Sequence, residues 1–206
     1  MPGPDLRVSV AVAKEKGWPA VFSEDVPTPL ALVVELGFGR GEFLAHLAEN
    51  APHTAHVGVE VSAKRVLKMA RRTARSELRN LRFIQGSAEE VVAEVLDDAS
   101  VSTFWINFPD PWPKKRHQRR RMLSREFLEL LSQKLEPGGN LEIATDHVDY
   151  ADWIDRRLAE IEALENLLAP QPHVAEVPGR FPTAYELEWR SEGRPLHFWR
   201  YRRRTP

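Results

Sequence analysis

The stretch Leu30-Ala-Leu-Val-Val-Glu-Leu-Gly-Phe-Gly-Arg-Gly41 decides the fold of this chain of 206 residues. Its first half is a short apolar run, which suits a strand buried on both faces. Its glycines allow the backbone to turn tightly into a helix, which we expect over Glu42–Asn50. A strand, a glycine turn and a helix in this order predict the first unit of a parallel α/β sheet with its ligand at the turn.

The same alternation continues along the chain. We expect strands over 56–60, 81–85, 101–107 and 140–145, and helices over 62–78, 88–96, 124–136 and 150–161. Right-handed crossovers then produce a mostly parallel sheet, with ligands at the carboxyl ends of its strands. In the tail, Tyr185, Leu187 and Trp189 alternate with polar residues, and so do residues 196–200. This alternation predicts an antiparallel pair that closes the sheet.

Five prolines among the first 29 residues interrupt any long element there. We therefore expect residues 1–28 to form an N-terminal segment that can be flexible, and residues 29–206 to form one domain. A single domain agrees with the length of the chain.

The composition excludes several classes of protein. Lys and Arg number 29 and Asp and Glu 30, so affinity for an anionic partner must come from uneven placement of charge. The absence of cysteine excludes disulfides, thiolate zinc sites and cysteine nucleophiles. No apolar run approaches the ~18 residues of a membrane span, and the start has no signal-peptide core, so we expect a cytoplasmic protein. The seven histidines lack metal-ligand spacing, and we expect no metal.

The glycine turn and two acidic residues form a first constellation. The spacing is G-x-G-x-G, whereas dinucleotide sites have G-x-G-x-x-G. Glu35 at the strand end would repel a pyrophosphate but attract a cation, and Glu60 ends the next strand, where an acid can hold ribose hydroxyls. This pattern favours a nucleoside with a positive, phosphate-free tail, such as S-adenosylmethionine. Ser87, after the third strand, suits contact with the adenine amine and suits a helix N-cap equally well.

A second constellation is Asn107-Phe-Pro-Asp-Pro-Trp112 at the end of the fourth strand. Two prolines stiffen this loop, which leaves Asp110 available to a ligand and offers Trp112 as a flat face for a purine. Seven Lys and Arg residues follow between Lys114 and Arg125. Such a run is either a solvated surface or a site for phosphate backbones.

A third constellation comprises Asp146, which ends the fifth strand, and the segment Thr183-Ala-Tyr-Glu186. Asp146 could cap the following helix or face the site. The proline-rich loop before Thr183 could fold back over the site.

These motifs, in this order, resemble the bacterial tRNA (guanine-N7-)-methyltransferases over most of the chain. The resemblance implies a class I methyltransferase (Rossmann-like) fold: a mostly parallel seven-stranded sheet, an antiparallel C-terminal strand and helices on both faces. It also implies transfer of a methyl group from S-adenosylmethionine to guanosine 46 in the tRNA variable loop, which forms 7-methylguanosine and S-adenosylhomocysteine. We expect tRNA as the partner, no membrane, and a monomer or homodimer.

Matching positions assign the site residues. Asp110 is the expected catalytic residue and also contacts the cofactor. The cofactor site is expected to contain Glu35, Gly37, Gly39, Glu60, Ser87, Asn107 and Asp110, and the tRNA site Lys114, Arg116, Asp146, Thr183, Ala184, Tyr185 and Glu186.

The chain departs from the family pattern at two of these positions. Ser87 stands where the family commonly has Asp, and Ala184 stands where it has Lys; Arg180 is a candidate to supply the missing charge. Two other functions remain open: a class I methyltransferase acting on a small molecule or protein, and a non-catalytic RNA-binding module.

Overall fold

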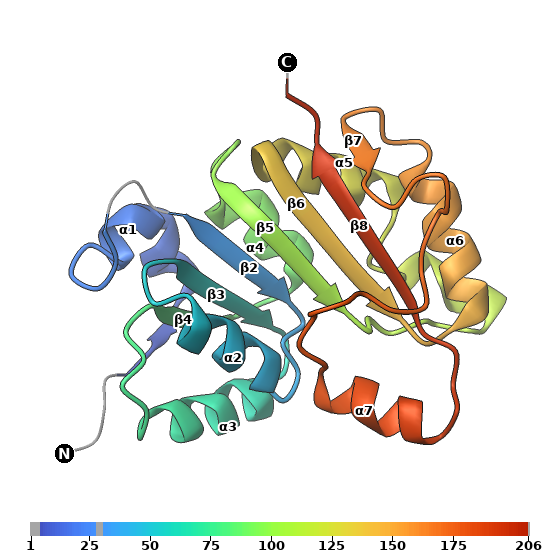
Figure 1. Ribbon diagram of the computed structural model, residues 1–206. Helices are drawn as coiled ribbons and strands as arrows, with labels where there is room; N and C mark the ends of the chain where they lie inside the picture. The colour runs from blue at the N-terminus through green and yellow to red at the C-terminus, as the bar shows by residue number, and fades with distance from the viewer. Residues whose placement is uncertain (1–4, 28–30, 206) are drawn as a thin grey trace.

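The computed structural model describes residues 5–27 and 31–205. Their strands form one sheet in the order β1-β4-β3-β2-β5-β6-β8-β7 (Figure 1). Strands β1 to β6 are parallel, and β8 runs antiparallel to both β6 and β7. The predicted fold class is confirmed, although the described sheet has eight strands rather than seven.

The strands are β1 (Arg7–Val8), β2 (Leu32–Leu36), β3 (Ala55–Glu60), β4 (Leu81–Gln85), β5 (Val101–Asn107), β6 (Leu135–Thr145), β7 (Leu164–Asn166) and β8 (His197–Arg203). The helices are α1 (Val10–Val21), α2 (Glu42–Asn50), α3 (Ala63–Thr73), α4 (Ala88–Val95), α5 (Arg125–Lys134), α6 (Val148–Leu158), α7 (Ala184–Ser191) and the 3₁₀ helix η1 (Lys115–Arg120).

Helices cover both faces of the sheet, as predicted. Helices α2 and α3 lie on one face, and α4, α5 and α6 lie on the other (Figure 1). Each layer has its own apolar core. Val91 of α4, Leu128 of α5 and Ile154 of α6 belong to the larger core, whereas Leu44 of α2 and Met69 of α3 belong to the smaller one. Two covered faces explain why β2 and β3 are apolar on both sides.

The amino-terminal part of the chain belongs to the same sheet and core. Strand β1 pairs with β4 at the edge of the sheet. Helix α1 bends at Gly17, which adopts a φ of 71°, and its Trp18 and the following Phe22 are buried. The sequence prediction set residues 1–28 apart because of their prolines. One proline is accommodated at the bend of α1, and the predicted boundary at 28/29 lies outside the described residues.

The predicted antiparallel pair over 185–200 is wrong in its first half. Residues 184–191 form helix α7, and the Thr183 hydroxyl accepts the Glu186 N–H at 3.0 Å as an N-cap. The alternating apolar residues therefore do not share one buried face, and Leu187 is 56% exposed. Strand β8 pairs instead with β6 and with the short β7, which was not predicted.

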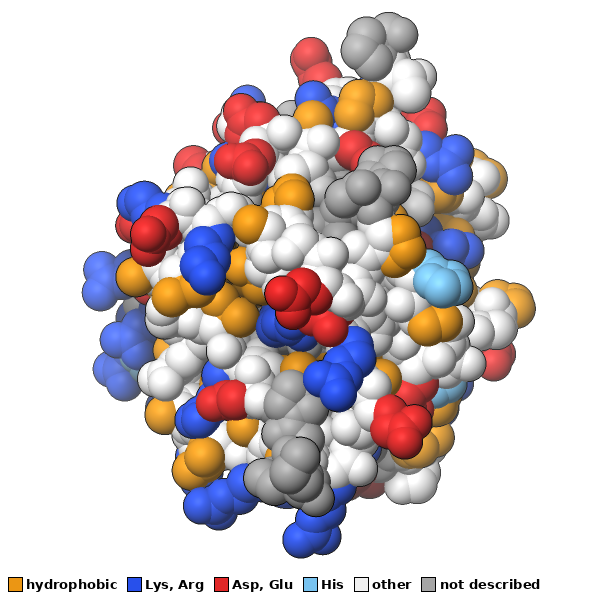
Figure 2. Space-filling view, turned by 90° about the vertical axis from the view of Figure 1, so that its left-hand side faces the viewer, with side chains coloured by type: hydrophobic (Ala, Val, Ile, Leu, Met, Phe, Trp, Pro, Cys, Tyr) orange, Lys and Arg blue, Asp and Glu red, His pale blue; other side chains and the backbone are white. Residues whose placement is uncertain are grey.

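Charged side chains of both signs are mixed over the face shown in Figure 2. In this view blue side chains stand along the left edge and at the lower end. The lysines and arginines of α3 are all exposed.

Candidate active site

A cavity of about 390 Å³ lies where β2, β5 and β6 end. Helix α7 lies below these carboxyl ends in Figure 1 and forms one wall. The topology thus places the cavity at the edge where parallel α/β sheets bind ligands. Nine of the residues predicted for the site line this cavity: Glu35, Gly37, Gly39, Asn107, Asp110, Asp146, Thr183, Ala184 and Tyr185.

Glu60 and Ser87 line an adjacent hollow of about 240 Å³, which shares Gly37 with the main cavity. The Glu60 carboxylate accepts the Gly39 N–H at 3.1 Å and the Ser62 N–H at 2.9 Å, and Arg65 lies 3.4 Å away. Glu60 therefore holds the glycine turn in place. The Ser87 hydroxyl accepts the Glu90 N–H at 3.1 Å, so the N-cap alternative for Ser87 is confirmed.

Glu35 is 2% exposed at the end of β2. Its Oε1 accepts a hydrogen bond from Asn107 Nδ2 at 2.9 Å, whereas no group among the described residues donates to Oε2. Burial raises the pKa of Glu35 to about 7, against the smaller lowering effects of Asn107 and Arg180. A buried carboxylate with one free oxygen favours a cationic partner, because a nearby positive charge stabilises the ionised form.

The glycine turn adopts conformations that side chains with a Cβ rarely take. Gly37 and Gly39 have φ values of 78° and 56°. A Cβ on Gly37 would meet nothing within 4 Å, so backbone conformation rather than space requires glycine there. A Cβ on Gly39 would lie 3.5 Å from the Tyr185 ring, which brings α7 close to the turn.

The loop after β5 carries Asp110 into the cavity. Phe108 and Trp112, on either side of it, have positive φ values of 54° and 43°, which is uncommon for residues other than glycine. Arg121 stabilises this conformation, because its Nε donates to the Pro111 carbonyl at 2.8 Å. The Trp112 ring lies outside the cavity, and the Arg120 guanidinium lies 5.1 Å from its centroid.

The basic run after this loop has two different parts. Lys114, the N-cap residue of η1, and Arg116, within η1, are both exposed and lie outside the cavity lining. Arg121 is buried, forms an ion pair with Asp149 and packs against Tyr150 and Trp153. The sequence grouped Arg121 with its neighbours, but its side chain stabilises the fold.

Helix α7 and its N-cap residue contribute Thr183, Ala184, Tyr185 and Trp189 to the cavity. Glu186 is 3% exposed and lies outside the lining. The Arg40 guanidinium lies 4.7 Å from the centroid of the Tyr185 ring.

Asp146 does not cap α6, because His147 does so. It pairs with Arg194 at 3.2 Å on the wall of the cavity.

The cavity wall also contains three arginines that were not predicted from the sequence: Arg40, Arg65 and Arg194. Only Arg40 lies inside a sequence motif, and the spacing of the three arginines does not identify any of them as a site residue. Arg180, proposed to replace the lysine missing at Ala184, does not line the cavity. Its side chain is buried beneath α7 and is 5% exposed.

Within residues 5–27 and 31–205, no group of His, Cys, Asp or Glu has the arrangement of a metal site. No helix of these same ranges is both long and apolar enough to cross a lipid bilayer.

The fold has solved neighbours among methyltransferases. The 16S rRNA methyltransferase KamB matches with a TM-score of 0.64 at 17% identity, over 90% of this chain and 92% of that one. The aminoglycoside resistance methyltransferase NpmB1 matches with a TM-score of 0.60 at 20% identity, over 88% and 91%. These likenesses concern the fold alone. The sheet order and the glycine turn after β2 are those of the class I methyltransferase fold.

Sequence comparisons give the family. Residues 30–199 match a family model described as "Putative methyltransferase". A tRNA (guanine-N(7)-)-methyltransferase of Geobacter metallireducens is 34% identical over 186 residues, which cover 90% of this chain and 86% of that protein. One of Halorhodospira halophila is 39% identical over 172 residues, 84% of this chain and 74% of that protein. The chain belongs to the tRNA (guanine-N7-)-methyltransferase family.

Proposed function

We propose that this chain transfers the methyl group of S-adenosylmethionine to N7 of guanosine 46 in the variable loop of tRNA. The relatives' names support the tRNA and the guanine N7. The structural observation that carries the proposal is the unpaired Glu35 Oε2, buried beside a glycine turn at the carboxyl end of the sheet. A tRNA substrate would place the protein in the cytoplasm.

The residues present fit this cofactor. Glu35 can accept the ammonium of the methionine part, and the turn through Gly37 and Gly39 lets a ligand approach the backbone closely. The hollow beside Glu60 and Ser87 continues from the turn and suits the nucleoside part. When bound, S-adenosylmethionine supplies a methyl group on a positive sulfonium.

The acceptor needs alignment more than proton transfer. Guanine N7 has a free lone pair and no proton, so no general base is required. Correct orientation of two reactants can contribute several kcal/mol to a reaction barrier. We assign Asp110 the role of accepting from the guanine N1–H and amine. In this position its carboxylate also favours the positive charge that develops on the purine.

The basic segment next to the Asp110 loop suits a nucleotide substrate. A guanine inside folded tRNA must swing out to reach a cavity. The exposed side chains of Lys114 and Arg116 lie just after the Asp110 loop, where they can hold phosphates near the displaced base. Transfer to a small molecule or protein would leave this basic segment without a partner.

The experiment is methyl transfer to tRNA made in vitro without modifications. The purified chain is incubated with methyl-labelled S-adenosylmethionine and tRNA, and the nucleosides are then separated. We expect labelled 7-methylguanosine, and none from a transcript that has adenosine at position 46. Label at another nucleoside would contradict the position, and label on protein alone would favour the other class of methyltransferase.

A further inference from the structure

We propose that Arg180 is a positioning residue of the active site: it fixes the side chains of Asn107 and Glu35 and ties them to helix α7. The inference rests on the proposed function only in that it takes the cavity beside Glu35 as the cofactor site. It assigns a role to a side chain that lies outside the lining of the cavity.

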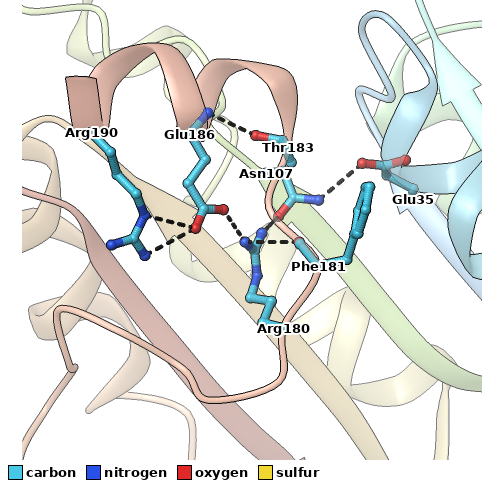
Figure 3. A network of polar contacts seen from close by, with 7 residues as sticks. All are labelled: Glu35, Asn107, Arg180, Phe181, Thr183, Glu186 and Arg190. Atoms are coloured by element: carbon cyan, nitrogen blue, oxygen red, sulfur yellow. Dashed lines mark hydrogen bonds and ion pairs between the residues drawn. The ribbon is translucent and has the colours of Figure 1, made fainter. Parts of the chain in front are cut away.

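The Arg180 guanidinium lies at the centre of the polar network in Figure 3. Its Nη2 donates to Asn107 Oδ1 at 2.5 Å, and its Nη1 pairs with Glu186. Aromatic rings surround the same group, with the centroids of Phe198, Phe43 and Trp105 at 4.9, 5.2 and 5.8 Å. The aromatic contacts and the two acceptors restrict the guanidinium to one place.

This contact determines which way the Asn107 amide points. A guanidinium only donates hydrogen bonds, so the amide must present its oxygen to Arg180. The amide nitrogen is then left to donate to Glu35 Oε1, as the 2.9 Å contact shows. The reversed amide would place its NH₂ group against the donors of Arg180 and its oxygen against the oxygen of Glu35. Arg180 thereby fixes Oε1 of Glu35 as the paired oxygen and leaves Oε2 free for a cation.

The same guanidinium contacts the substrate side of the cavity. Glu186 lies in the first turn of α7, three residues after Thr183, whose hydroxyl caps this helix. The segment from Thr183 to Tyr185 lines the cavity. The chain of contacts from Glu35 through Asn107 and Arg180 to Glu186 therefore joins the cofactor side to the α7 wall (Figure 3).

The effect of Arg180 on Glu35 can be measured through the ionisation of the Glu35 carboxyl group. Burial raises the pKa of Glu35, and the acids Glu42 of α2 and Glu60 of β3 add to that effect, whereas Asn107 and Arg180 oppose it. Arg180 in turn faces Glu142 of β6 as well as Glu186 and Glu35. Loss of Arg180 removes a cation near Glu35 and frees the Asn107 amide to reverse, and both changes disfavour the carboxylate.

The test measures binding of S-adenosylhomocysteine, which carries the same ammonium, by calorimetry between pH 6 and 8.5. We expect wild-type affinity to rise as pH increases through about 7, where Glu35 ionises. Arg180→Gln should weaken binding about fivefold at pH 7 and move the midpoint up by about one pH unit. The affinities of the two proteins should converge at high pH.

Arg190→Gln is the matched control. Arg190 donates to Glu186 from the more exposed side at 3.1 Å and reaches neither Asn107 nor Glu35. If the network only held α7 in place, both variants would lower Tm and neither would shift the pH profile. Arg190→Gln should keep the wild-type profile.

One further variant serves if Arg180→Gln does not fold, and another tests whether Arg180 acts through Asn107. If Arg180→Gln does not fold, Arg180→Lys retains a charge without the forked donor and should give a smaller shift in the same direction. In an Asn107→Ala background, Arg180→Gln should weaken binding less than it does in wild type, because Arg180 acts through Asn107.

The outcomes separate the inference from the proposed function. A folded Arg180 variant with the wild-type pH profile overturns the inference alone. A wild-type protein that binds no S-adenosylhomocysteine at any pH overturns the cofactor site and the inference together.

Discussion

The two sides of the cavity are built differently. On the proposed cofactor side, Glu35 and Glu60 end neighbouring strands and are 2% and 3% exposed. On the proposed acceptor side, Asp110 lies on a loop, and Asp146 pairs with the half-exposed Arg194. Buried carboxylates on regular strands hold their geometry without a ligand. Side chains on a loop and at a helix end can adjust, which suits a side that must admit a bulky base.

The two sides therefore contribute to binding in different ways. Buried groups interact strongly with charge because little water screens them. The ion pair of Asp146 lies closer to solvent, so it can exchange partners when a substrate arrives. We therefore expect substitutions on the cofactor side to change affinity and its pH dependence. Substitutions on the acceptor side should change turnover and RNA binding.

The largest expected effect is on turnover. Asp110→Asn should retain most of the affinity for the cofactor and lose more than ~10²-fold in kcat, comparable with the loss of one preorganised polar group. Single-turnover methyl transfer to tRNA measures it, with binding of S-adenosylhomocysteine as the second readout. Asp146→Asn is the comparison, because Asp146 is the other carboxylate on this side. Near-normal turnover in Asp110→Asn would reject its assignment.

On the cofactor side, Glu35→Gln should weaken binding of S-adenosylhomocysteine at least ~10-fold at pH 8 while stabilising the free protein. The folded-state pKa of Glu35, about 7, lies above its ordinary value of 4.5. Between pH 4.5 and about 7 the folded protein therefore binds more protons than the unfolded chain. The stability contributed by the protonated Glu35 is lost as the pH rises through this range. The shift corresponds to as much as about 3 kcal/mol.

Thermal unfolding at pH 5 and pH 8 measures that stability. The Tm of Glu35→Gln relative to wild type should be higher at pH 8 than at pH 5. An equal difference at both values would show that Glu35 is not desolvated as the structure implies.

The sequence predicted the placement of the strand-end residues better than that of the segment after residue 169, for physical reasons. Strand ends and glycine turns leave local signals, so Glu35, the turn and Glu60 were all placed at the carboxyl edge. The chain past residue 169 was harder because apolar residues alternate in α7 as they would in a strand. The pattern Thr183-x-x-Glu186 was the available signal for a helix start.

Identical residue types in one run were also indistinguishable by sequence. Arg116, Arg119 and Arg121 are equivalent in a charge pattern, yet only Arg121 is buried. Its partner Asp149 lies 28 residues away, beyond the reach of any local signal. Arg180 is a similar case, since Asn107 is 73 residues away from it.

The free energy of unfolding should distinguish the buried Arg121 from the exposed Arg119. Arg121→Gln should destabilise the protein by about 2 kcal/mol, because it removes charged hydrogen bonds and leaves the Pro111 carbonyl without its donor. Arg119→Gln, on the exposed part of the run, should change stability little. Urea unfolding of both variants measures the difference. Equal stabilities would mean that Arg121 does not hold the loop of Asp110.

The smallest expected effect is on the salt dependence of tRNA binding. If the exposed basic segment contacts phosphates, Arg116→Ala and Arg119→Ala should each weaken tRNA binding and lower the slope of log Kd against log salt by about one. Filter binding at several salt concentrations measures this slope, and Arg71→Ala on α3 is the control, since it removes an exposed charge from a different surface. An unchanged slope in the first two variants would assign the segment to solubility. The acceptor side would then have to bind RNA through the wall of the cavity, where Arg40, Arg65 and Arg194 carry positive charge.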